Sequence, residues 1–173
     1  AEIAARFNLT EKTYDGFDPT GICVPFGATA VACKLLNLDK QQTWNALGIA
    51  FNRCGGSFQS NIDGTLSVRF NQGWVAQDAI QSARMAQLGI TGPQNFIEGI
   101  YGYLHLYGKN EIPLAHIVTG LGSEDRAGAM VYKKFPSCGA TQGMTELMLG
   151  MLQEHQLRPE NIKSVKVTLS PYG

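Results

Sequence analysis

A run of small residues inside a predicted helix restricts the fold of this chain most. Residues 27–33 read Gly-Ala-Thr-Ala-Val-Ala-Cys, in the middle of a helix that the pattern predicts over 22–36. Small side chains let a second helix approach closely, because little bulk separates the two backbones. A helix of this kind is typical of the interior of a helical bundle. We therefore expect 27–33 to be buried against a neighbouring helix.

Further helices are predicted before and after this segment. Ala1 to Phe7 resembles the last turns of a helix, and Asp39 with Gln42 forms a capping-box pattern at the start of another. A long helix is predicted over 68–88, where Gly89 follows as a stop signal. A short helix near 94–98 and an amphipathic one over 143–155 complete the set.

The last residues change character. From Val165 to Leu169 apolar and polar residues alternate, as in a β-strand, and no strand to pair with it is predicted. The predicted order is a series of helices, then one further helix and one strand. This order indicates a mainly α chain, with an all-helical domain over 1–131 and the start of an α+β domain over 132–173. The unmatched ends lead us to expect an internal piece of a longer protein.

The charge distribution bears on which partners the chain binds, and the spacing of cysteines and histidines bears on metal binding and redox state. The formal net charge is zero, and the basic residues are scattered, which disfavours nucleic acid or an anionic membrane as a partner. The apolar runs are far shorter than a membrane span. The four cysteines and three histidines have no metal-ligand spacing, so we expect no metal and reduced thiols in the cytoplasm.

Several short motifs then resemble one family in their order along the chain. They are 16–21 (Gly-Phe-Asp-Pro-Thr-Gly), 25–30 (Pro-Phe-Gly-Ala-Thr-Ala), 35–39 (Leu-Leu-Asn-Leu-Asp), 46–50 (Ala-Leu-Gly-Ile-Ala), 63–65 (Asp-Gly-Thr), 69–74 (Arg-Phe-Asn-Gln-Gly-Trp), 89–93 (Gly-Ile-Thr-Gly-Pro), 98–102 (Glu-Gly-Ile-Tyr-Gly) and 133–138 (Lys-Lys-Phe-Pro-Ser-Cys). Each motif alone is weak, but together they span nearly all of the chain. The sequence resembles the MmgE/PrpD family, which includes 2-methylcitrate dehydratase.

The resemblance implies a fold and a chemistry. Members of this family have a helical domain built from both chain ends and an α+β lid inserted between them. They act on di- and tricarboxylates, by dehydration of 2-methylcitrate in propionate catabolism, decarboxylation of cis-aconitate or epimerisation of iminodisuccinate. They need no cofactor and are usually homodimers. The implied function is a cytoplasmic lyase or isomerase that abstracts a proton next to a carboxylate.

Two candidate catalytic residues follow from the resemblance. Asp18 stands where most members have a histidine, and a carboxylate can also act as a general base. The alternative for Asp18 is a turn or cap residue, because Asp before Pro favours a turn. Lys133 matches a lysine at the mouth of the family's active site, and its alternative is a solvated charge.

Three residues are candidates for substrate binding. Arg69 matches a basic position and would bind a carboxylate through its planar fork, unless it forms a salt bridge at a helix start. The lysine usually found before it is Val68 here. Asn71 occupies a frequent histidine position, and Cys138 stands where others have His or Cys, with a small buried apolar residue as its alternative.

Two expectations remain to be compared with the structure. Asp18, Arg69 and Lys133 should converge on one cleft, although they are far apart in the sequence. The replaced histidines and lysine also leave a second function open, in which the chain is an inactive family member that binds carboxylates or serves as a structural subunit.

Overall fold

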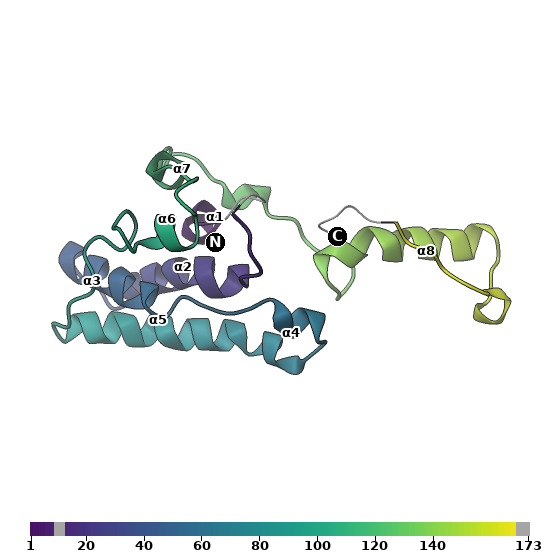
Figure 1. Cartoon of the computed structure of the whole chain (residues 1–173), viewed down its shortest axis with the longest axis horizontal. Coiled ribbons are helices and arrows are strands. Elements are labelled where there is room, and N and C mark those ends of the chain that lie inside the picture. Colours follow the sequence, from purple (N-terminus) through teal and green to yellow (C-terminus); the bar gives the residue numbers. More distant parts are fainter. Residues whose placement is uncertain (9–12, 169–173) are drawn as a thin grey trace. The chain divides into compact units, whose positions relative to one another are not determined.

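The computed structural model describes residues 1–8 and 13–168 and is mainly helical (Figure 1). The chain divides into two compact units, 1–129 and 130–173. The mainly α fold class is confirmed. That the second unit begins an α+β lid stays a prediction.

Three helices form the centre of the first unit: α2 (Pro19–Leu35), α3 (Lys40–Phe51) and α5 (Asn71–Gln87). They pack against one another, and the short α1 (Glu2–Arg6) packs against α2 (Figure 1). Helix α2 begins three residues before the predicted start, because Asp18 caps it and Pro19 fits its first turn. The capping box of Asp39 and Gln42 at α3 is confirmed.

The remaining elements are short, apart from one helix in the second unit. The first unit also contains α4 (Gln59–Ile62), η1 (Leu66–Arg69), α6 (Tyr103–Leu106), α7 (Leu114–Val118) and η2 (Ala127–Ala129). The second contains η3 (Gly139–Thr141), α8 (Gln142–Glu154) and η4 (Pro159–Asn161).

Small residues line the interface of the three central helices. Ala32 and Cys33 of α2 form a buried cluster with Ala46 of α3 and with Ala83 and Ala86 of α5. The predicted close packing of the small-residue segment is confirmed for its inner face. Its outer face carries Val31, which is 58% exposed.

A second, aromatic cluster lies between α1, α2 and the segment around Phe96. The rings of Phe7 and Phe26 stack with centroids 4.0 Å apart. Tyr103 meets Phe7 edge-on, and its hydroxyl donates a hydrogen bond to the carbonyl of Phe7 at 2.7 Å. Burial raises the pKa of Tyr103, so this hydroxyl stays a donor.

The short helix predicted near 94–98 is wrong, because these residues form turns. The carbonyls of Phe96 and Ile97 accept hydrogen bonds from the amides of Tyr103 and Leu104, at 2.8 and 3.0 Å. These bonds close the segment into a loop. The two carbonyls therefore accept hydrogen bonds across the loop and not along a continuous helix.

The predicted terminal strand is not formed by residues 165–168, whereas Leu169 lies outside the described residues. A strand needs a partner for its hydrogen bonds. Within residues 1–8 and 13–168 the β-pairing is limited to an isolated bridge between Phe17 and Ser57. Across the same ranges, no helix has both the length and the apolar character needed to cross a membrane.

Candidate active site

Asp18 is held in place by its position at the start of α2. Its side chain is 5% exposed, and it accepts a hydrogen bond from the amide of Thr20 at 2.8 Å. The amide of Asp18 donates to the carbonyl of Gly56 at 3.1 Å, next to the bridge between Phe17 and Ser57. The loop before α2 is therefore fastened to the loop after α3.

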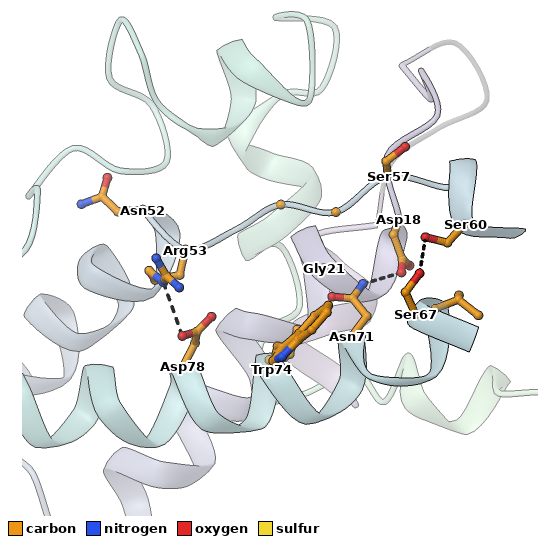
Figure 2. A pocket seen from close by; sticks show the side chains of 14 residues that line it. Asp18, Gly21, Asn52, Arg53, Ser57, Ser60, Ser67, Asn71, Trp74 and Asp78 are labelled. Carbon is orange, nitrogen blue, oxygen red and sulfur yellow. Dashed lines mark hydrogen bonds and ion pairs between the residues drawn. The ribbon is translucent and has the colours of Figure 1, made fainter. Parts of the chain in front are cut away.

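Asn71, the first residue of α5, supplies the second partner of this carboxylate. Its amide nitrogen donates a hydrogen bond to Oδ2 of Asp18, while Oδ1 accepts from Thr20. Figure 2 shows the two side chains pointing toward each other. A hydrogen bond to an ionised acceptor is stronger than one between neutral groups, so Asn71 fixes the direction of the carboxylate.

Both residues line a cleft of about 650 Å³ (Figure 2). Its walls come from the start of α2, the segment after α3, α4, η1 and the first two turns of α5. The lining residues are Asp18, Gly21, Asn52, Arg53, Gly55, Gly56, Ser57, Ser60, Ser67, Val68, Asn71, Trp74, Val75 and Asp78.

Part of the cleft wall is bare backbone. A Cβ on Gly21 would lie 1.6 Å from the carbonyl oxygen of Gly55, which no side chain can accommodate. Gly56 has φ +117°, a conformation that L side chains rarely adopt, and a Cβ there would lie 3.2 Å from the amide nitrogen of Asn71. These glycines let the two loops meet beside Asp18.

The cleft contains one ion pair. Nε of Arg53 lies 3.3 Å from Oδ1 of Asp78, and Figure 2 shows the two side chains facing each other. Near Asp18, burial and the negative charge of the carboxylate raise the pKa of Tyr14. Burial raises the pKa of Cys54 to about 12, so this thiol next to the cleft is protonated at neutral pH and is a poor nucleophile.

Comparison with known protein families identifies the family of this chain. The family model described as the MmgE/PrpD N-terminal domain matches residues 1–114, which include the whole cleft. The chain belongs to the MmgE/PrpD family.

A curated relative points to the same family. The chain is 25% identical over 154 residues to a protein named cis-aconitate decarboxylase-like protein oryM, from Aspergillus oryzae. The match covers 83% of the chain and 32% of the relative, so the chain spans about a third of the relative's length.

Of the MmgE/PrpD site residues predicted from the sequence, the structure brings two together. Asp18 and Asn71 contact each other in the cleft. Val68 also lines the cleft. Arg69 is exposed at the end of η1 and is not among the lining residues, and its role in binding stays a prediction.

The two other predicted residues belong to the second unit. Lys133 and Cys138 are exposed, and Cys138 directly precedes η3. The neighbouring Lys134 pairs with Glu146 of α8, with Nζ 2.6 Å from Oε1. The meeting of Lys133 with Asp18 and Arg69 in one cleft stays a prediction.

Sequence reasoning did not select Arg53 and Asp78. Arg53 stands before Cys-Gly-Gly, and this glycine pair was the available signal of close backbone approach. Asp78 follows Arg53 by 25 residues on α5, with no local pattern that joins them.

The described residues contain no group of three or more His, Cys, Asp and Glu side chains that could hold a metal ion. The cleft offers two carboxylates, one guanidinium, amides and hydroxyls. Such a set can move a proton and hold a polar, anionic molecule.

Proposed function

We propose that the chain is part of a lyase or isomerase that acts on a di- or tricarboxylate, such as 2-methylcitrate, and that Asp18 is its general base. The observation that carries this proposal is the carboxylate of Asp18 in the wall of a polar cleft, aimed by Asn71. Membership of a family with a cis-aconitate decarboxylase-like relative supports the class of reaction.

In the proposed reaction, Asp18 takes a proton from the carbon next to a substrate carboxylate. The C–H bond breaks, and its electron pair spreads onto that carboxylate, where hydrogen-bond donors stabilise the charge. In a dehydration the pair then forms the C=C bond, while Lys133 gives a proton to the hydroxyl that leaves as water.

The other predicted residues have supporting roles in this proposal. Asn71 positions the base and binds substrate, and Arg69 and Cys138 contribute further contacts to the polar groups of the substrate. The enzyme is proposed to be a cytoplasmic homodimer without a cofactor.

The test is hydrogen exchange in the full-length protein. The protein is incubated in D₂O with 2-methylcitrate, citrate and malate, and NMR follows deuterium entry next to the carboxylate together with product formation. Asp18→Asn should lower the rate by about 10²- to 10⁴-fold, the usual contribution of a general base. Asp15→Asn is the matched control, because Asp15 is exposed and pairs with Lys109 at 3.2 Å.

Val68 in the cleft wall favours the second candidate, an inactive carboxylate-binding subunit, because it replaces the usual lysine. Binding of a carboxylate without exchange or turnover in the wild-type protein would support this candidate and contradict the proposed enzyme. Equal rates in the wild type and Asp18→Asn would remove Asp18 as the base.

A further inference from the structure

The charges in the wall of the cleft do not match a polyanion. Among the lining residues the charged ones are Asp18, Asp78 and Arg53, which gives two negative charges and one positive charge. Each carboxylate that enters a partly dry cleft needs a cation or several donors. Arg53 is the one cation in this described wall, so the wall can compensate one substrate carboxylate.

We propose that Arg53 is the carboxylate anchor of this cleft and that Asp78 holds it when no substrate is bound. This inference rests on the proposed function, since it names the group that binds one carboxylate of the proposed substrate. It differs from the prediction for Arg69, which lies outside the lining residues.

The geometry of Arg53 suits this role. Its contact with Asp78 uses Nε, and the Arg53 side chain makes no other hydrogen bond or ion pair within 1–8 and 13–168. The two terminal nitrogens therefore remain available, and they can donate two parallel hydrogen bonds to a carboxylate.

The ion pair between Arg53 and Asp78 is also weak enough for a substrate carboxylate to replace Asp78. The side chain of Arg53 is 64% exposed and that of Asp78 is 20% exposed. Exposed ion pairs contribute little to stability, because water screens the charges and the long side chains lose freedom. A substrate carboxylate can therefore compete with Asp78 for the guanidinium, and Asp78 reduces the affinity for anions.

The experiment compares two hydroxy acids that differ by one carboxylate. Lactate and malate are titrated into the full-length protein by calorimetry, with wild type, Arg53→Gln, Asp78→Asn and Arg84→Gln. Arg84 is an exposed arginine of α5 outside the cleft lining, so its variant is the matched control.

Arg53→Gln should weaken both ligands by the same factor, about 10- to 100-fold, because it removes the partner of the carboxylate that they share. Asp78→Asn should strengthen both by about two- to fivefold, because it removes a competitor worth no more than a surface ion pair. Arg84→Gln should leave both affinities unchanged.

Unchanged affinity in a folded Arg53→Gln protein would overturn the inference, above all if Arg69→Gln weakens binding instead. Weakening of malate alone would also overturn it, because Arg53 would then bind only the second carboxylate. The proposed function fails separately: if Asp18→Asn retains full exchange while Arg53→Gln weakens binding, the anchor stands and the base does not.

Discussion

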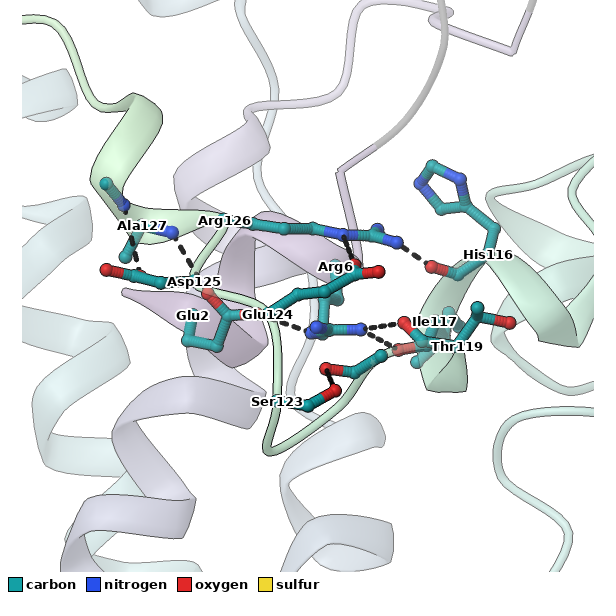
Figure 3. A network of polar contacts seen from close by, with 12 residues as sticks. Glu2, Arg6, His116, Ile117, Thr119, Ser123, Glu124, Asp125, Arg126 and Ala127 are labelled. Carbon is teal, nitrogen blue, oxygen red and sulfur yellow. Dashed lines mark hydrogen bonds and ion pairs between the residues drawn. The ribbon is translucent and has the colours of Figure 1, made fainter.

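Two charged side chains are buried in the described part of the first unit, and their surroundings differ. Arg6 of α1 is 1% exposed, and Asp18 before α2 is 5% exposed. Nη1 of Arg6 donates to the carbonyls of Ile117 and Thr119, at 3.1 and 2.7 Å (Figure 3). The cavity beside Arg6, about 330 Å³, has mostly apolar walls, whereas polar and apolar atoms contribute about equally to the walls of the cleft beside Asp18.

The difference separates a buried charge that joins two elements of the fold from one that lies in the wall of a cleft. Arg6 joins α1 to the end of α7, and its Nε lies 2.5 Å from Oε1 of Glu2. Glu2 in turn accepts from the amide of Ala127 at 2.9 Å (Figure 3). Burial of a charge is therefore not by itself the mark of a site. The more polar cleft in front of Asp18 distinguishes this residue from Arg6.

The largest effect on stability is expected from Arg6→Leu. The change removes three hydrogen bonds, leaves two carbonyls without their donor and takes from Glu2 its cationic partner, so the free energy of unfolding should fall by about 3 kcal/mol. Chemical denaturation followed by circular dichroism measures this. Arg84→Leu, at an exposed position of α5, should change it by less than about 0.5 kcal/mol. A loss below about 1 kcal/mol for Arg6→Leu would make its buried network unimportant for the fold.

A smaller effect is expected at the cleft. Asp18→Ala removes the cap of α2 and the acceptor of Asn71, so it should cost about 2 kcal/mol, at the upper end for a lost N-cap. Asp39→Ala is the control, because Asp39 caps α3 at an exposed position and should cost about 1 kcal/mol. Asp18→Asn can keep the cap and should cost less than Asp18→Ala. Equal losses at Asp18 and Asp39 would show that the Asn71 contact adds no stability.

Local patterns in the sequence were sufficient to predict part of the fold around these residues. The capping box at Asp39 and the small residues of α2 depend on neighbours in the sequence or on helical periodicity, and both predictions are confirmed. Asp18 before Pro19 was also visible as a cap candidate. Its function as a base remains a prediction. The same aspartate at the same position suits a helix cap and a general base, so the sequence does not distinguish the two roles.

The long-range contacts could not be predicted from the sequence. Asn71 lies 53 residues after Asp18, and they meet only because α5 packs against α2. Arg6 looked like the charged end of a helix, and its burial depends on carbonyls more than 100 residues away. Patterns within one helix carry no information on which distant carbonyl will face it.

The smallest effect expected is a pH dependence that arises at Glu2. Burial pushes the pKa of Glu2 upward, but the hydrogen bonds from Arg6 and from the amides of Ala127 and Arg126 outweigh it, so the net pKa lies below the ordinary value of 4.5. A group with a lowered pKa in the folded state stabilises the protein above its unfolded pKa, and this stabilisation is lost as the pH falls through the folded value.

Glu2→Gln removes this charge at every pH. The difference in thermal midpoint between wild type and Glu2→Gln should therefore be constant from about pH 7 to pH 5 and vanish once the pH is well below 4.5. Glu111→Gln, at an exposed position, controls for the general effect of losing one carboxylate. A difference close to zero at every pH would mean that Glu2 supports Arg6 by shape and hydrogen bonding and not by charge, because glutamine has nearly the same shape as glutamate. In that case the contrast with Asp18 would lie in the cleft alone.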